Sequence, residues 1–357
     1  MINEYMPDSV SPPGETLIET LERLEMSQTE LAKRMGRPIK TLNEIIKGKA
    51  AITPETALQL EKVLRIPARF WNNRERLYRE SLAREMEQAR LREDLTWLKS
   101  LPIPEMIKNR WIAKEGNKIE QLATVLQFFG VAGVAQWRKI WTEPLVAYRE
   151  SPVFKSKLGA LSAWLREGEL EAQQLECSLY KKTAFKERLS AIRELTKEPA
   201  PDTFVPLLVA LSAQAGVAVV FIPELQGVKV SGATYWLTAH KPVIQLNLRY
   251  KTNDHLWFTF FHEAAHILLH EKRLIVEDLD GKRDIEDDAN TFSGNFLIDQ
   301  KKYQKFVTTN RRFSKTSVKT FAEEIDIAPG IVVGRLQHDR YIPFTHLNDF
   351  KIHYTWN

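Results

Sequence analysis

Hydrophobic residues recur at helical spacing through residues 14–74, in short runs divided by turn signals. Thr53-Pro54 opens one run as a capping residue followed by proline at the first helical position. The apolar stripes are Leu17, Leu21 and Leu24; Leu31, Ala32 and Met35; Leu42, Ile45 and Ile46; and Ala57, Leu60, Val63 and Leu64. A charged segment with helical spacing follows over residues 75–100. The pattern predicts a five-helix domain over residues 1–75.

The pattern changes further along the chain. Residues 105–200 are mostly helical and end at the linker-like Glu198-Pro199-Ala200-Pro201. Expected strands follow a helix near residues 204–215; they span residues 217–222, 232–237 and 242–248. A long apolar helix is expected over residues 254–270, with mainly helical structure after it. We therefore predict a mainly α chain with a small, roughly three-stranded sheet (α+β), with a helical middle region over residues 76–200 and a third domain over residues 201–357.

Composition narrows the class of protein. The apolar fraction of 43% and charged fraction of 27% are those of a globular chain. The polar start of the sequence does not resemble a signal peptide, and its apolar stretches are too short to span a bilayer. The single cysteine, Cys177, excludes an intrachain disulfide and a thiolate zinc cluster. We expect a cytoplasmic protein without membrane contact.

The net charge of +5 is unevenly distributed. Residues 33–49 contain six lysines and arginines and one acid, Glu44, and residues 301–319 contain seven with no acid. Basic stretches can face phosphates, although a solvated surface is the commoner interpretation of either one alone.

The first basic stretch coincides with a helix-turn-helix pattern. Ser27-Gln28-Thr29-Glu30 has capping-box spacing, and the helix that it opens ends at Gly36, which suits a left-handed turn. A second short helix begins near Pro38 and stops at Gly48. This arrangement is typical of a motif that places its second helix in the major groove of DNA.

On the second helix, Leu42, Ile45 and Ile46 are expected to face the core, which leaves a polar outer face. Lysine and arginine suit phosphates or guanine edges, and asparagine can pair with adenine. The alternative is a small protein-binding module with a charged face. The expected DNA contacts are Gln28, Thr29, Arg37, Lys40, Thr41, Asn43 and Lys47.

About 65 residues carry a specific family resemblance. They include Pro13-Gly14-Glu15-Thr16-Leu17, Ser27-Gln28-Thr29-Glu30-Leu31-Ala32, Glu44-Ile45-Ile46-Lys47-Gly48-Lys49, Ile52-Thr53-Pro54-Glu55-Thr56-Ala57 and Phe70-Trp71. This part of the chain resembles the HigA-type (Xre-like) antitoxin repressors. The resemblance implies a module that binds an operator in double-stranded DNA and belongs to a class that often dimerises, so we expect a homodimer.

A metal-site motif lies in the long apolar helix. His262-Glu263-Ala264-Ala265-His266 is an HExxH sequence, and four residues on a helix bring both imidazoles to one face. That spacing can bind one Zn²⁺, with Glu263 placed beside it as general base. The helix is apolar nearly all round, so two histidines and a glutamate in it need a polar role. The alternative is a hydrogen-bonded pair of core histidines, but the four-residue spacing with an acid between favours a metal.

A third ligand should be His, Asp or Glu. Of the acids in residues 284–292 we favour Glu286, because Asn290 follows one turn later and could orient a ligand histidine. Asp288 is the second choice for ligand, and His270 is expected to pack or hydrogen-bond nearby. Residues with phenol groups that could stabilise a transition state are Tyr235, Tyr250 and Tyr303.

Residues 217–299 resemble the ImmA/IrrE family of regulatory metallopeptidases. The resemblance runs through His262-Glu263-Ala264-Ala265-His266-Ile267-Leu268-Leu269-His270 and Glu286-Asp287-Asp288-Ala289-Asn290-Thr291-Phe292. It implies a gluzincin-like zinc site with His262, His266 and the downstream acid as ligands. Residues 318–336 resemble the end of fused repressor-peptidase proteins, and we expect two helices packed on the peptidase core.

Three functions are compatible with these patterns. The first is a DNA-binding regulator whose zinc endopeptidase cleaves a repressor, a toxin or itself. The second is a non-catalytic antitoxin or repressor with a structural or sensory zinc site. The third is the peptidase effector of a toxin-antitoxin or phage-defence module. Glu263 favours the first and third, because a structural site needs no general base.

Overall fold

The computed structural model describes residues 11–142, 158–228, 230–247, 252–270, 274–276 and 283–354. The chain divides into two compact units, residues 1–95 (unit 1) and residues 96–357 (unit 2). Helices predominate and a small mixed sheet lies in unit 2, so the predicted α+β class is confirmed. No helix of the described ranges is long and apolar enough to cross a membrane.

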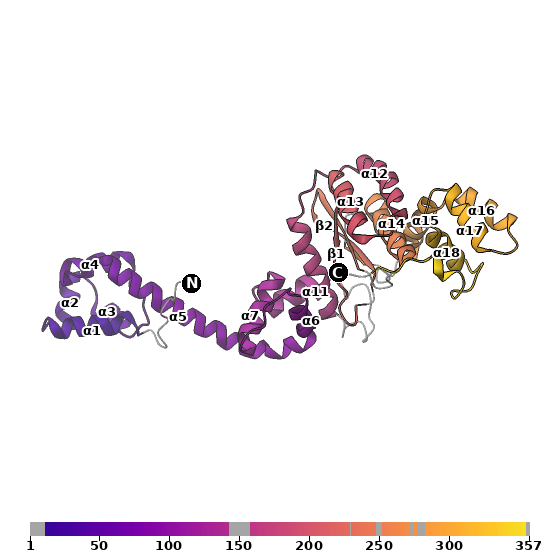
Figure 1. Cartoon of the computed structure of the whole chain (residues 1–357). Helices are drawn as coiled ribbons and strands as arrows, with labels where there is room; N and C mark the ends of the chain where they lie inside the picture. The colour runs from indigo at the N-terminus through magenta and orange to yellow at the C-terminus, as the bar shows by residue number, and fades with distance from the viewer. Residues whose placement is uncertain are drawn as a thin grey trace. The chain divides into compact units, whose positions relative to one another are not determined.

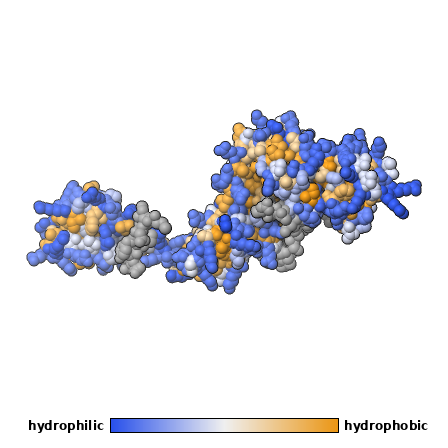
Figure 2. Space-filling model, viewed as in Figure 1, coloured by the Kyte–Doolittle hydropathy of each residue, from blue (hydrophilic) through white to orange (hydrophobic). Residues whose placement is uncertain are grey.

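Unit 1 is a bundle of short helices followed by one long helix (Figure 1). Its elements are α1 (Pro13–Arg23), α2 (Gln28–Met35), α3 (Ile39–Ile46), α4 (Pro54–Leu64) and α5 (Ala68–Asp94). The predicted apolar stripes meet in one core, where Leu17, Leu31 and Trp71 are fully buried. Hydrophilic residues cover most of the visible face of this unit, with hydrophobic residues between them (Figure 2).

Close packing of α1 on α3 depends on a glycine. A Cβ added at Gly14 would lie 2.1 Å from the backbone oxygen of Ile46, far inside van der Waals contact. The long helix α5 is tied to the rest of the unit by Glu75, whose carboxylate accepts hydrogen bonds from the Ile52 backbone N–H at 3.0 Å and from Arg79 Nε at 2.7 Å. The first contact ties α5 to the segment between α3 and α4, and the second lies within α5 and orients the carboxylate.

Unit 2 begins with short helices that carry Trp97, Trp137 and Trp141. These are η1 (Leu95–Ser100), α6 (Ile103–Lys108), α7 (Lys118–Phe129), α8 (Val134–Trp137) and the π-helical turn η2 (Arg138–Thr142). Among the described residues, the helices that follow up to the sheet are α11 (Leu158–Gln174), α12 (Lys182–Glu194), η3 (Leu195–Lys197) and α13 (Pro201–Gln214). Trp97, Phe129 and Trp137 pack edge to face or tilted in the first group.

The sheet has the order β1-β3-β2-β4, in which β1 runs parallel to β3 and the other pairs are antiparallel. Its strands are β1 (Ala218–Phe221), β2 (Gly232–Thr238), β3 (Lys241–Leu246) and the two-residue β4 (Ile275–Val276). The three longer strands fall where the sequence predicts them; Leu248, the predicted end of the third, lies outside the described residues. The short β4 was not predicted.

Successive side chains of β2 and β3 point to opposite faces of the sheet, and each face is covered by a helix. Thr234 and its partner Ile244 face α14 (Asn253–Leu269), whereas Tyr235 and Gln245 face α11. Gly168 of α11 lets that helix approach Gln245, because a Cβ there would lie 1.9 Å from Gln245 Oε1. The sheet therefore lies between α11 and α14 (Figure 1).

The remaining helices pack around α14. They are α15 (Arg283–Leu297), α16 (Gln300–Thr309), α17 (Lys315–Glu324), α18 (Pro329–His338) and η4 (Asn348–Phe350). Residues of α17 and α18 share the hydrophobic core of α14, as predicted for the end of the chain. Residues after η4 also reach α14: Lys351 Nζ lies 2.6 Å from Asp254 Oδ2, and the Ile352 backbone N–H donates to Asn253 Oδ1 at 3.1 Å.

The predicted boundaries at residues 75 and 200 differ from the two units. Helix α5 continues without interruption to Asp94, so unit 1 extends beyond residue 75. Residues 96–142 and 158–200 belong to the same compact unit as the sheet instead of forming a separate middle region, and Trp164 Nε1 of α11 donates to the Ile222 backbone oxygen at 3.2 Å. Hydrophobic spacing marks the buried face of a helix but does not specify the element that covers it.

Candidate metal centre and nucleic-acid interface

Helix α14 places His262 and His266 in the interior of unit 2. Their exposed fractions are 1% each, and Glu263 between them is fully buried. Helix α15 packs along α14: Ser293 Oγ donates to the Phe258 backbone oxygen at 2.8 Å, and Ala289 is buried at the contact. This packing brings the start of α15 beside the histidines.

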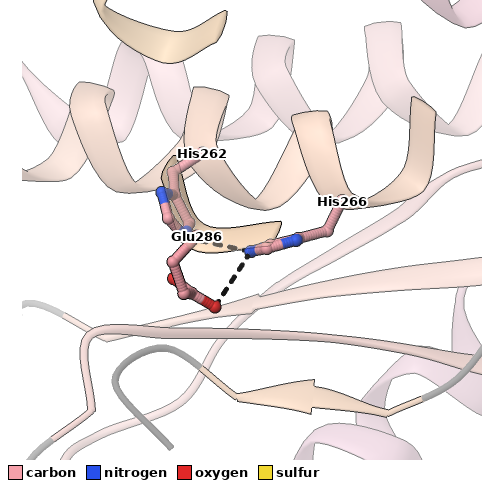
Figure 3. Close-up of side chains that lie close together, drawn as sticks. All are labelled: His262, His266 and Glu286. Carbon is pink, nitrogen blue, oxygen red and sulfur yellow. Dashed lines mark hydrogen bonds and ion pairs between the residues drawn. The ribbon is translucent and has the colours of Figure 1, made fainter. Parts of the chain in front are cut away.

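Glu286 of α15 points at both imidazoles (Figure 3). Its Oε2 lies 3.1 Å from His262 Nε2 and its Oε1 lies 3.7 Å from His266 Nε2. The two Nε2 atoms are 3.0 Å apart. The structure thus brings together the three residues that the sequence singles out, with one ligand atom from each within 4.8 Å of the others.

The donor set fits Zn²⁺. Ligand atoms about 2.0–2.1 Å from a tetrahedral ion lie roughly 3.3 Å from one another. The measured separations of 3.0, 3.1 and 3.7 Å surround that value. Two imidazoles and a carboxylate are also the donor types that zinc takes in catalytic sites, where a fourth position stays open. His262, His266 and Glu286 could therefore hold one ion without rearrangement of the helices.

Asn290 supports one histidine from behind. Its Oδ1 lies 3.0 Å from His262 Nδ1, one turn after Glu286 on the same face of α15. When His262 Nε2 faces an ion, its proton must be on Nδ1, where it can donate to Asn290. The sequence places Asn290 in this role, and the structure provides the contact for it.

Two contacts to the motif could not be seen in the sequence. Thr234 of β2 is buried, and its hydroxyl lies 2.7 Å from Glu263 Oε2 and 3.1 Å from the Glu263 backbone oxygen. Gly232 of the same strand lies so close that an added Cβ would come within 2.6 Å of Glu263 Oε1. The only sequence signal was period-two spacing, which places residues 232 and 234 on one face of a strand.

His270 and Asp288 also lie at the edge of the site. His270 Nδ1 is 2.9 Å from His266 Nδ1, and His270 Nε2 is 3.9 Å from Asp288 Oδ2. The His270 side chain is 9% exposed, whereas that of Asp288 is 70% exposed. The structure therefore places Asp288 beside His270, outside the His262, His266 and Glu286 group.

The candidate phenols differ in their surroundings. The Tyr235 hydroxyl donates to Gln245 Oε1 at 3.0 Å on the α11 side of the sheet, and burial raises the pKa of this phenol well above its ordinary value. Tyr303 of α16 is buried beneath the guanidinium of Arg335, 5.3 Å from its ring centroid. Tyr250 lies outside the described residues. Neither described phenol is placed beside Glu263.

In unit 1, α2 and α3 form the expected helix-turn-helix. Ser27 Oγ accepts from the Glu30 backbone N–H at 3.1 Å, and Gly36 ends α2 in the left-handed region with φ of 65°. The reciprocal half of the predicted capping box is replaced by another contact. The Glu30 carboxylate accepts from Arg34 Nε at 2.7 Å, because a residue four positions on competes for it.

The predicted DNA contacts fall into two groups. Lys40 is exposed on α3 and Lys47 directly after it, Thr41 and Asn43 are half-buried on α3, and Gln28 and Thr29 lie at the start of α2. Leu42 and Ile45 face the core. Arg37 is engaged within the unit instead: its guanidinium donates to Gln59 and lies 3.4 Å from Glu55, both on α4.

Comparisons with known proteins find one family match in unit 1 and another in unit 2. Residues 17–71 match the family described as helix-turn-helix, and residues 213–337 match the peptidase family described as the IrrE N-terminal-like domain. The chain is 36% identical over 61 residues to an uncharacterized HTH-type transcriptional regulator, YddM, of Escherichia coli, and 42% identical over 52 residues to virulence-associated protein A of Dichelobacter nodosus.

These relatives are matched only in part. The alignments cover 17% and 14% of this chain, and the chain spans 65% and 51% of the length of the two relatives. A solved addiction module antidote protein of the HigA family from Coxiella burnetii is 32% identical; the match covers 24% of this chain and 92% of that one, with a TM-score of 0.22.

In both matched ranges the family corresponds to the elements that the structure shows. The helix-turn-helix match covers α2 and α3 with their flanking helices, and the peptidase-family match covers the sheet, α14 and α15. Residues 17–71 are thus a DNA-binding helix-turn-helix domain, and residues 213–337 are a domain of the IrrE N-terminal-like peptidase family.

Proposed function

We propose that the chain is a transcriptional regulator whose second unit is a Zn²⁺-dependent endopeptidase that cleaves a regulatory protein. The observation that carries the proposal is the convergence of His262, His266 and Glu286 beside a fully buried Glu263. A metal held only for structure needs no further carboxylate beside its ligands, whereas Glu263 supplies one. The substrate is a repressor, a toxin or the chain itself.

Each side chain has a separate task in peptide hydrolysis. Zn²⁺, when bound, polarises the scissile carbonyl and makes water a stronger acid. Glu263 accepts the proton of the attacking water and delivers it to the leaving amine. Thr234 donates to one oxygen of that carboxylate at 2.7 Å, which fixes its orientation. Asn290 fixes the ring of His262 in the same way.

The sheet offers a place for the substrate backbone. An extended peptide can add to an exposed strand and be held by main-chain hydrogen bonds. Strand β2 passes Glu263 through Gly232 and Thr234 and is paired on its other side with the edge strand β4, so a peptide added along β4 would lie one strand away from the strand that contacts the general base. Cleavage would be tested by incubating the Zn²⁺-loaded chain with itself and with the products of neighbouring genes, beside a Glu263→Gln protein.

The second candidate is a sensor. In that case Zn²⁺ binding would change operator affinity, and no candidate protein would be cleaved. The contact of Thr234 with the Glu263 carboxylate favours the peptidase, because it orients the one group that metal binding alone does not require. A peptidase effector of a toxin-antitoxin or phage-defence module would use the same chemistry on a different target.

Unit 1 is proposed to bind an operator in double-stranded DNA through α3. Lys40 on this helix and Lys47 directly after it are exposed, whereas Leu42 and Ile45 are buried in the core. A homodimer would present two such helices to a palindromic site. Exposed Phe70 and Leu77 lie seven residues apart, hence on one face of α5, and could contact the second copy; the mass of the chain in solution checks this.

Replacing Lys40 and Lys47 by alanine is expected to weaken binding to DNA from upstream of the gene. Each lost phosphate contact should reduce the salt dependence, the slope of log K against log salt, by about 1. Binding is measured at several salt concentrations, with Lys62→Ala on α4 as an exposed control. Unchanged affinity and slope in the double variant would contradict the assignment of α3.

A further inference from the structure

His270 follows α14 directly as its C-cap and lies on the same side of the helix as the motif. His262, His266 and His270 are spaced by four residues, so each turn brings the next imidazole over the last with a small rotation. The rings of His266 and His270 have centroids 5.0 Å apart. The His270 backbone N–H donates to the His266 backbone oxygen at 3.2 Å, which caps the end of the helix.

The contact between these rings determines where the protons lie. A neutral imidazole carries one N–H, and a nitrogen that binds an ion must keep its lone pair. With Nε2 of His266 directed at the ion, its proton is on Nδ1, 2.9 Å from His270 Nδ1. His270 Nδ1 then accepts, and the proton of His270 is on its Nε2.

That second proton faces a carboxylate. His270 Nε2 lies 3.9 Å from Asp288 Oδ2, two residues after Glu286 on α15. The groups form a line from the Asp288 carboxylate through His270 to His266 and its Nε2. His262 has a separate and simpler support in Asn290. The two histidines of the motif would therefore be held from behind by different residues.

We propose that His270, backed by Asp288, is a positioning residue that fixes the tautomer and ring orientation of His266 for Zn²⁺. The inference rests on the metal site of the proposed function. The inference depends on the 2.9 Å contact between His266 Nδ1 and His270 Nδ1, whose rings are almost wholly buried. Asp288, 70% exposed and 3.9 Å away, contributes less than His270.

The experiment measures Zn²⁺ affinity by competition with a chelator in the full chain, without any use of cleavage. His270→Phe keeps an aromatic ring at this position but has no acceptor, and is expected to weaken Zn²⁺ binding by about 10- to 100-fold. His270→Gln restores an acceptor and should recover most of that loss. Asp288→Asn should have a smaller effect, and His338→Phe, 78% exposed on α18, none.

The outcomes separate the two proposals. The absorption spectrum of the Co²⁺-loaded protein should change in His270→Phe and return towards that of wild type in His270→Gln, which packing alone does not predict. Wild-type Zn²⁺ affinity in His270→Phe, or no recovery in His270→Gln, would overturn the positioning role alone. No Zn²⁺ binding by the wild-type chain would overturn the metal site and this inference with it.

Discussion

Glu263→Gln is expected to abolish any Zn²⁺-dependent cleavage while the chain keeps its metal. The amide has nearly the shape of the carboxylate and can still accept from Thr234, but it cannot take up the proton of the attacking water. General acid–base catalysis contributes about 10²–10⁴-fold to such rates, so a loss in that range is expected. Glu263 is not one of the three ligand residues, so the Zn²⁺ content should be unchanged.

The measurement is the rate of cleavage of whichever candidate protein the wild-type chain cuts, with bound zinc determined on the same samples. Glu323→Gln removes a carboxylate that is 66% exposed on α17 and serves as the control. Cleavage by Glu263→Gln at the wild-type rate would show that another group acts as base or that a contaminant is responsible.

Gly232→Ala is expected to cause a second large loss, although it adds only a methyl group. The new Cβ would lie 2.6 Å from Glu263 Oε1 and 2.8 Å from both Glu263 Cγ and Thr259 Cγ2. These atoms are buried between β2 and α14, so either the strand or the Glu263 side chain must shift. Overpacking of this kind costs about 1–3 kcal/mol of stability, and a displaced base lowers the rate further.

Thermal unfolding and cleavage rate are measured together for this variant. Gly116→Ala is the matched control, because its Cβ would meet no atom closer than 3.9 Å. If Gly232→Ala unfolded and cleaved as wild type does, the close approach of β2 to Glu263 would be wrong.

Much of the site could be expected from the sequence because helical geometry is local. The spacing of His262 and His266 places them on one face, and the spacing of Glu286 and Asn290 does the same on α15. The structure then brings these faces together. The sequence could not show that α15 packs along α14, because the spacing within each helix does not specify which helices meet.

The missed contacts depend on packing between distant elements. Thr234 meets Glu263 across 29 residues of chain, and that contact requires the register of β2 against β3 as well as the position of α14. His270 was recognised as a neighbour of the motif, but not as a partner of His266, because the end of α14 directs its ring back over the site.

The difference between local spacing and long-range packing also explains why the predicted domain boundaries differ from the observed units. Periodicity marks the buried stripe of α11 but not its partner, which is the sheet of unit 2, where Gly168 meets Gln245. The long α5 carries many charged residues and few buried ones, and nothing in its spacing marks residue 75 as an end. Arg37 is expected in the DNA interface from its residue type and its place in the turn, whereas its contacts with Gln59 and Glu55 depend on the position of α4, which the sequence does not show.

The central claim is that His262, His266 and Glu286 together hold one Zn²⁺. It is tested most directly by zinc content per chain after dialysis, for wild type, His266→Ala and Glu286→Gln, with circular dichroism to show that each variant is folded. The account predicts one zinc per wild-type chain and little or none in either folded variant, with His338→Ala unaffected. A wild-type chain that binds no zinc, or folded variants that bind as much as wild type, would contradict it.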